Sequence, residues 1–117
     1  MKVCVCGSRS IVKYETVASH LSLLKEQGLK FTQLVSGCCR GPDLLAETWA
    51  ETVGVNIIRF PALWKRFGLS AGPIRNKQMA DYSDIVIAFY DGKSAGTKQM
   101  IQYCKEINRE IKVIQCY

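Results

Sequence analysis

The sequence predicts an α/β fold: a single Rossmann-like three-layer domain with a mostly parallel five-stranded sheet and helices on both faces. The first observation is that short apolar runs alternate with stretches whose apolar residues recur at helical spacing. The second is that this alternation is strict, so right-handed crossovers return each strand to the same sheet. Because 117 residues is the usual length of one domain, we expect residues 1–117 to form one domain without linkers or repeats.

Each element of the first half has its own signal. The continuous apolar run at the N-terminus is typical of a parallel strand buried on both faces. The second helix opens with Pro42 and Asp43, because a first turn does not use the N–H that proline lacks and favours a carboxylate. The predicted elements are a strand over 2–6, a helix from 14 to about 28, a strand over 33–36, a helix from 41 to 54 and a strand over 55–60.

The second half begins with an irregular segment over 62–72 that is rich in bulky and basic side chains. We expect Pro73 to open the next helix and Thr97 to cap the last one. The irregular segment is short enough to be a functional loop. The other predicted elements are a helix from 73 to about 82, a strand within 84–90, a helix from 97 to about 107 and a strand over 111–115.

Composition narrows the class of protein. Hydrophobic residues make up 48% and charged residues 22%, which is ordinary for a globular chain and argues against disorder. No apolar run approaches the roughly 20 residues that span a bilayer, and no export signal is legible, so we expect a cytoplasmic protein without a membrane partner. Sixteen basic and ten acidic residues give a net charge of +6, which favours anionic partners such as phosphates.

Six cysteines do not predict a disulfide framework in a chain without an export signal. Cys4 and Cys6 alternate within an apolar run, and Cys104 lies on the apolar face of a predicted helix, so these three are expected in the core. With one histidine and no C-x-x-C pair, we expect neither a metal site nor a cofactor. The adjacent pair Cys38-Cys39 has no assigned role.

Four loops follow predicted strands, and in a parallel sheet such loops meet at the carboxyl edge, where ligands bind. Each loop contains glycine and a basic residue, and the helix that follows directs free N–H groups to the same edge. We therefore predict an anion site there, without catalytic residues. The candidate ligand-binding residues are Gly7, Ser8, Arg9, Gly37, Arg40, Asp43, Arg75, Asn76, Asp91, Lys93, Ser94, Gly96 and Thr97.

The loop over residues 92–97 carries the better signal, because two glycines allow a backbone nest and Ser94 and Thr97 offer hydroxyl donors. Neither the Walker pattern nor the dinucleotide fingerprint is present. Arg75 is expected in the first turn of its helix, where the dipole opposes a cation unless an anion binds. We therefore expect its removal to weaken ligand binding without lowering stability; a solvated first turn is the alternative.

The segments 7–9, 36–43, 71–79 and 91–97, in this order, resemble the motifs of the SLOG superfamily, the LOG- and DprA-like Rossmannoid proteins. The branch they resemble is that of small YspA-related proteins, long known as a domain of unknown function. The resemblance covers nearly the whole chain and implies a nucleotide-binding domain that self-associates into a homo-oligomer. It also implies a ligand derived from nucleotides, with sensing or sequestering roles in phage and bacterial defence.

Two departures from the family pattern bear on function. The phosphoribohydrolases of the superfamily share a P-G-G-x-G-T-x-x-E motif, and its catalytic glutamate falls on Met100 here. Methionine cannot act as a base, so the resemblance to these enzymes does not extend to their chemistry. Relatives of the YspA-related branch usually carry glycine or a small residue where Cys38 and Cys39 stand.

The preferred prediction is a nucleotide-binding protein for a phosphate-bearing ligand such as an ADP-ribose derivative or a signalling nucleotide. Arg9, Arg75 and Lys93 would pair with phosphates, and Asp43 would hold a ribose hydroxyl or serve its helix. One alternative is a nucleotide hydrolase that cleaves an N-glycosidic or phosphate bond, using Asp43, Asp91 or Glu47. Another is single-stranded nucleic-acid binding through Trp64-Lys65-Arg66-Phe67, although a loop that packs its aromatic rings over the sheet edge explains this run better.

Overall fold

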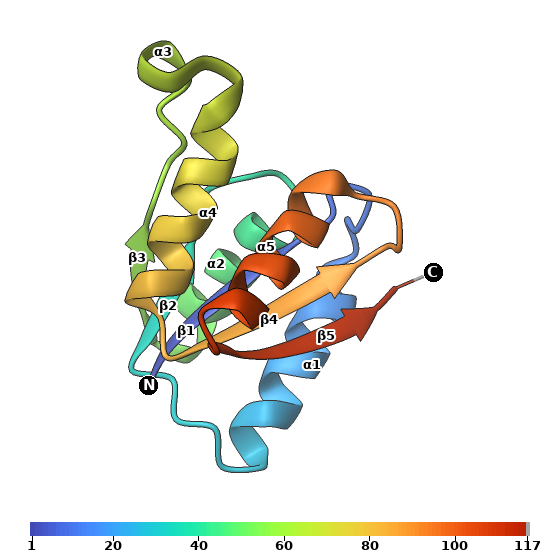
Figure 1. The fold of residues 1–117 in the computed structure, drawn as a ribbon. Helices are drawn as coiled ribbons and strands as arrows, with labels where there is room; N and C mark the ends of the chain where they lie inside the picture. Colours follow the sequence, from blue (N-terminus) through green and yellow to red (C-terminus); the bar gives the residue numbers. More distant parts are fainter. Residues whose placement is uncertain (117) are drawn as a thin grey trace.

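Five strands form one sheet in the order β3-β2-β1-β4-β5 in the computed structural model, which describes residues 1–116 (Figure 1). Every neighbouring pair of strands is parallel, so the predicted α/β class is confirmed and no antiparallel strand interrupts the sheet. The elements in chain order are β1 (Lys2–Gly7), α1 (Tyr14–Glu26), β2 (Gln33–Ser36), α2 (Pro42–Val53), β3 (Asn56–Arg59), α3 (Trp64–Phe67), the 3-10 turn η1 (Gly68–Ser70), α4 (Ala71–Tyr82), β4 (Ile85–Tyr90), α5 (Ala95–Glu106) and β5 (Glu110–Gln115).

Helices cover both faces of the sheet, which confirms the three-layer arrangement. Helices α1 and α2 lie on one face, and α4 and α5 lie on the other (Figure 1). The alternation of β1 explains how one strand serves two cores: Val3 and Val5 pack with α1 and α2, whereas Cys4 and Cys6 pack with α4 and α5. Cys104 of α5 completes the second core, so all three cysteines expected there are buried in it.

The strand order reverses between β1 and β4. Strands β2 and β3 lie on one side of β1. The connection that contains α4 then leads to the other side of β1, where β4 and β5 lie. Loops that follow β1 and β4 therefore leave toward opposite faces and open a crevice at the carboxyl edge. This switch point is where the sequence predicts a ligand.

The largest difference from the sequence prediction lies between β3 and β4. Residues 62–72 are not irregular throughout, because they contain α3 and η1, and α4 begins at Ala71 instead of Pro73. Proline occupies the third position of α4, within the first turn, where no intrahelical N–H bond is required. As a result Arg75 lies in the second turn of α4. Figure 1 shows α3 projecting beyond the end of α4, away from the sheet.

The start of α5 also differs from the prediction. Ser94 is the N-cap, and its side chain accepts a hydrogen bond from the backbone N–H of Thr97, which was expected to be the cap itself. Thr97 instead belongs to the first turn and is buried. Across residues 1–116, no helix combines the length and the apolar character that crossing a bilayer requires.

Candidate functional site

Ser8 joins the two loops of the switch point. Its side chain is fully buried, its Oγ accepts a hydrogen bond from the backbone N–H of Asp91 at 3.1 Å, and it lies 3.4 Å from Oγ1 of Thr97. The loops after β1 and β4 and the start of α5 are thus held together from inside. Ser8 and Thr97, both predicted as ligand donors, use their hydroxyl groups for this internal contact.

Asp91 organises the loop before α5. One carboxylate oxygen accepts hydrogen bonds from the backbone N–H groups of Lys93 and Ser94, at 2.8 and 2.9 Å, and the other accepts one from the hydroxyl of Ser10 at 2.9 Å. The two N–H groups lower the pKa of Asp91 to about 2, with a further contribution from Ser10. The predicted backbone nest therefore already holds a carboxylate of the chain.

The first turn of α5 keeps donors for a ligand. Within the part of the chain that the structure describes, no acceptor faces the backbone N–H groups of Ala95 and Gly96. Ser94 Oγ accepts hydrogen bonds from the backbone N–H of Thr97 at 3.5 Å and from its hydroxyl at 3.2 Å, so its own hydrogen remains free to donate. These groups can bind an anion at the positive end of the α5 dipole.

A cavity of about 420 Å³ opens at the switch point, and we call it the sheet-edge cavity. It brings together most of the predicted binding residues, which come from the end of β1 and the loop after it, the loop after β4, and the helices α2, α4 and α5. Cys6, Ser10, Cys39 and Met100 also line it, although the sequence did not single them out as ligand contacts. The predicted residues that line it are Gly7, Arg9, Asp43, Arg75, Asn76, Asp91, Ser94, Gly96 and Thr97.

A second cavity of about 470 Å³ adjoins the first, and we call it the arginine cavity. Arg9, Cys39 and Arg75 line both cavities, so they form a shared wall. The predicted residues Gly37 and Arg40 lie here, whereas the remaining two, Ser8 and Lys93, line neither cavity. The residues that line the arginine cavity are Arg9, Gly37, Cys38, Cys39, Arg40, Pro61, Ala62, Trp64 and Arg75.

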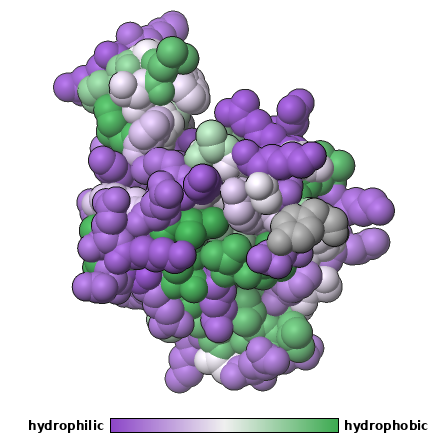
Figure 2. Space-filling view, turned by 45° about the vertical axis from the view of Figure 1, so that its right-hand side comes forward, coloured by the Kyte–Doolittle hydropathy of each residue, from purple (hydrophilic) through white to green (hydrophobic). Residues whose placement is uncertain are grey.

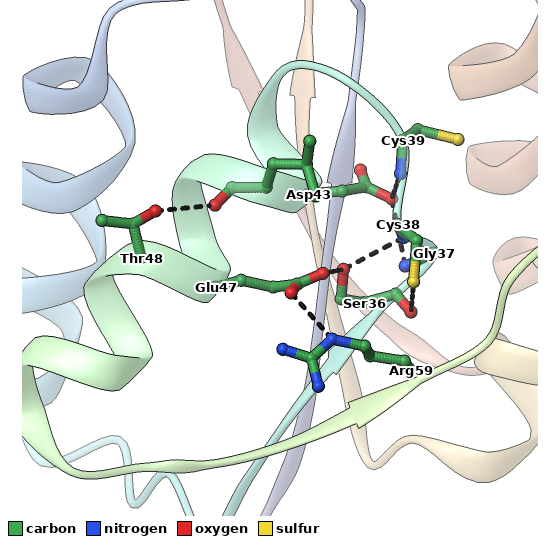
Figure 3. Close-up of polar contacts among 9 residues, drawn as sticks. Ser36, Gly37, Cys38, Cys39, Asp43, Glu47, Thr48 and Arg59 are labelled. Atoms are coloured by element: carbon green, nitrogen blue, oxygen red, sulfur yellow. Dashed lines mark hydrogen bonds and ion pairs between the residues drawn. The ribbon is translucent and has the colours of Figure 1, made fainter.

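The carboxylates of Asp43 and Glu47, both on α2, hold the loop over residues 37–39 in place (Figure 3). Asp43 Oδ2 accepts hydrogen bonds from the backbone N–H groups of Gly37 at 3.0 Å and Cys39 at 3.4 Å. Ser36 Oγ accepts one from the N–H of Cys38 at 3.1 Å and donates to Oε2 of Glu47 at 2.6 Å. All three loop N–H groups are therefore used inside the protein, and the loop offers a ligand its side chains.

Glu47 belongs to this support and not to a cavity. Its second oxygen pairs with Nε of Arg59 at 2.9 Å, and its side chain lines neither cavity. Figure 3 shows the resulting chain of contacts from Arg59 through Glu47 and Ser36 to the loop. Glu47, one of the three carboxylates considered for hydrolysis, thus has a structural role: it connects α2 to Ser36 of β2 and Arg59 of β3.

Arg75 is buried, with only 7% of its surface exposed. Its Nη1 donates to the carbonyl oxygen of Gly37 at 2.6 Å, and its Nε donates to Oδ1 of Asn76 at 3.0 Å. The amide of Asn76 in turn donates to Gln99 of α5 at 2.9 Å. The expectation of a first-turn arginine opposed by the helix dipole is therefore wrong, because α4 begins earlier and the side chain is held by partners on two elements.

Asp43 is the one carboxyl of the site with an elevated pKa. It is almost fully buried, and burial raises its pKa to about 6, although Arg75 and the N–H groups of Cys39 and Gly37 oppose this rise. No Asp43–Arg75 ion pair is present in the described residues, so the charge of Asp43 is only partly compensated. A carboxyl of this kind beside a cavity titrates near neutral pH.

This pKa predicts a pH dependence of stability. Between the ordinary and the raised pKa, the folded chain keeps a proton that the unfolded chain releases, so stability is higher at low pH and falls as the pH rises through 6. We expect the free energy of unfolding to fall by on the order of 1–3 kcal/mol from about pH 4 to about pH 7 relative to Asp43→Asn. Urea titrations of both proteins measure this difference. Parallel pH profiles for the two would contradict it.

A comparison with known protein families assigns the first half of the chain to a family. The model of the YspA, cpYpsA-related SLOG family matches residues 1–67. The chain belongs to this family. No curated protein and no solved structure matches the chain. Membership in a SLOG family indicates a nucleotide-related role in ligand binding or processing. The match ends before Arg75 and the loop over 91–97, whose roles therefore rest on the structure.

Two features of this SLOG protein concern its departures from the family pattern. Met100, which stands where the hydrolases carry their glutamate, is fully buried and contributes an apolar group to the lining of the sheet-edge cavity. Cys38 has a φ of 64°, in the left-handed region that favours glycine, so glycine would suit the backbone at this position better than cysteine does. Burial raises the pKa of the Cys38 thiol, which disfavours the reactive thiolate.

Proposed function

We propose that this SLOG protein binds a phosphate-bearing, nucleotide-derived ligand, such as an ADP-ribose derivative or a signalling nucleotide. The observation that carries the proposal is the shared wall of the two cavities, where Arg9 and Arg75 face the crevice at the switch point of the sheet. Guanidinium groups bind phosphate through charge-assisted, often bidentate hydrogen bonds. The sheet-edge cavity, about 420 Å³ in volume, lies within the range of small-molecule sites.

The two arginines have different freedom before a ligand binds. Arg75 is held by Gly37 and Asn76, so its guanidinium is oriented in advance and loses little entropy on binding. Arg9 is exposed and can adjust to the ligand. Ser94 and the N–H group of Gly96, at the start of α5, add hydrogen-bond donors to the lining of the same cavity. Lys93 lines neither cavity, so we assign it no direct phosphate contact.

Isothermal calorimetry against ADP-ribose, cyclic nucleotides and nucleoside monophosphates tests this function. At least one of these probes should bind with a saturable, one-site isotherm, and Arg9→Ala should weaken that binding without changing the circular dichroism spectrum. Lys93→Ala is the matched control, because it removes a positive charge outside the cavities. A folded protein that binds none of the probes, or equal losses in both variants, would overturn the proposed phosphate site.

One observation favours a second candidate, a nucleotide hydrolase. Asp43 lines the sheet-edge cavity with a pKa of about 6, which suits a general acid or base, whereas the pKa of Asp91 is lowered to about 2 and Glu47 lies outside the cavity. Turnover of a bound nucleotide that Asp43→Asn abolishes without loss of affinity would favour the enzyme. Unchanged nucleotide after prolonged incubation favours binding alone.

The biological context that we propose is sensing or sequestering of such a ligand in phage or bacterial defence, with the chain acting as a homo-oligomer. This context rests on the roles that the resemblance to the SLOG superfamily implies. Light scattering of the purified protein, with and without ADP-ribose, tests the oligomer: a monomer under both conditions would remove that part of the proposal.

A further inference from the structure

The arginine cavity has an aromatic wall that the phosphate site does not use. Trp64 of α3 lines it and is 49% exposed, which is unusual for so large an apolar side chain. One edge of the indole lies beside Gly72 at the start of α4, since its Cη2 atom would lie 3.5 Å from a Cβ placed there. About half of the Trp64 surface therefore remains uncovered beside the cavity.

The remaining lining determines which chemistry fits this indole. Three arginines surround the cavity and no carboxylate does, so its potential is positive, whereas the sheet-edge cavity also contains Asp43 and Asp91. Pro61 and Ala62 add a small apolar surface beside the indole. A flat aromatic ring attached to an anionic group satisfies both features, because it stacks on the indole while its charge meets the guanidinium groups. Nucleotides have this composition.

We propose that the arginine cavity is a nucleobase subsite in which the base stacks on Trp64. Since Arg9 and Arg75 line both cavities, a ligand whose phosphates lie between them reaches into each cavity with one arm. The class of ligand is a nucleoside diphosphate that carries a second ribosyl group, with the base in the arginine cavity and the second ribose in the sheet-edge cavity. This inference rests on the proposed function, and it adds Trp64 and the direction of the ligand.

The lobe that carries Trp64 stands apart from the body of the protein. Figure 2 shows this lobe, which comprises α3 and η1, with apolar and polar side chains mixed on its surface. Leu69 on η1 is 95% exposed and lines neither cavity, so it reports on the lobe without touching the subsite. Leu69→Ala is therefore the matched control for a substitution at Trp64.

Calorimetry with three probes separates the base from the phosphate. ADP-ribose and AMP contain the adenine ring, whereas ribose 5-phosphate has a ribose and a phosphate but no base. Trp64→Ala should weaken the binding of ADP-ribose and AMP by roughly 5- to 150-fold and leave ribose 5-phosphate within about twofold. Trp64→Phe should retain most of the affinity because a phenyl ring still stacks. Leu69→Ala should bind all three probes as the unchanged protein does.

Intrinsic fluorescence gives a second measurement that does not depend on Trp64→Ala folding. The chain has two tryptophans, and Trp49 is buried, with its indole N–H bonded to Ser22 at 2.9 Å. AMP should quench the emission of Trp64, and ribose 5-phosphate should not. The quenching should disappear in Trp64→Phe while calorimetry still detects AMP.

Each result separates this inference from the proposed function. Equal losses of ribose 5-phosphate and AMP binding in Trp64→Ala, or no quenching by AMP in a protein that binds it, would overturn the base subsite and leave the phosphate site standing. If no probe binds the folded protein, both proposals fail. If a single-stranded oligonucleotide binds with a steep salt dependence that Trp64→Ala removes, Trp64 belongs to a nucleic-acid interface instead.

Discussion

Replacing Arg75 with alanine is expected to lower the free energy of unfolding by about 1–3 kcal/mol and to weaken ADP-ribose binding by about 1.5–3 kcal/mol. The loss of stability follows because the carbonyl of Gly37 loses its buried donor and Asp43 loses its nearest favourable charge. The loss of affinity follows because the guanidinium lines both cavities. Urea unfolding without ligand and calorimetry below the unfolding transition measure the two effects separately.

Arg40→Ala is the control for this experiment, because Arg40 lines the arginine cavity but is exposed. Arg40→Ala should leave the free energy of unfolding unchanged and weaken ADP-ribose binding less than Arg75→Ala does. Arg75→Lys should recover only part of the stability, because one ammonium group cannot reproduce the two hydrogen bonds that the guanidinium donates to Gly37 and Asn76. Unchanged stability in Arg75→Ala would show that the contact with Gly37 contributes nothing to the fold.

Gly7→Ala is expected to destabilise the fold by about 3 kcal/mol or more, the upper range for overpacking. Gly7 ends β1 opposite Phe89 of β4, and a Cβ there would clash with the carbonyl oxygen of Phe89. It would also lie 2.7 Å from the ring of Pro42, at the start of α2. Because the first contact is with backbone, β1 and β4 must separate to accept the methyl group. Thermal and urea unfolding measure the loss.

Gly96→Ala is the matched control, because no atom beyond its chain neighbours and its own helix backbone lies within 4 Å of a Cβ at Gly96. Alanine suits a helix better than glycine, so this variant should be at least as stable as the unchanged protein. Gly96 lines the sheet-edge cavity, and its added methyl group should therefore affect ligand binding alone. Equal stability of Gly7→Ala and Gly96→Ala would mean that the junction of β1, β4 and α2 is looser than the structure indicates.

The fold class and the placement of the strands could be predicted because they depend on local periodicity. Residues 33–36 were predicted as a strand with the bounds of β2, and the run at residues 2–6 falls within β1. The site could be located for a related reason. The carboxyl ends of parallel strands share one edge, so residues as distant as Arg9 and Thr97 were expected together, and both line the sheet-edge cavity.

The sequence by itself determined the fold class, the family motifs and the edge where the loops meet, because periods of two and 3.6 residues and the glycine-rich loops are local properties. Only the tertiary structure decided which donors at this edge are free. Asp43 and Asp91 hold N–H groups that sequence reasoning left for a ligand, and Arg75 is fastened to Gly37. Trp64 enters a cavity wall because α3 and the earlier start of α4 bring it there. These partners are set by packing between distant segments, which no local pattern records.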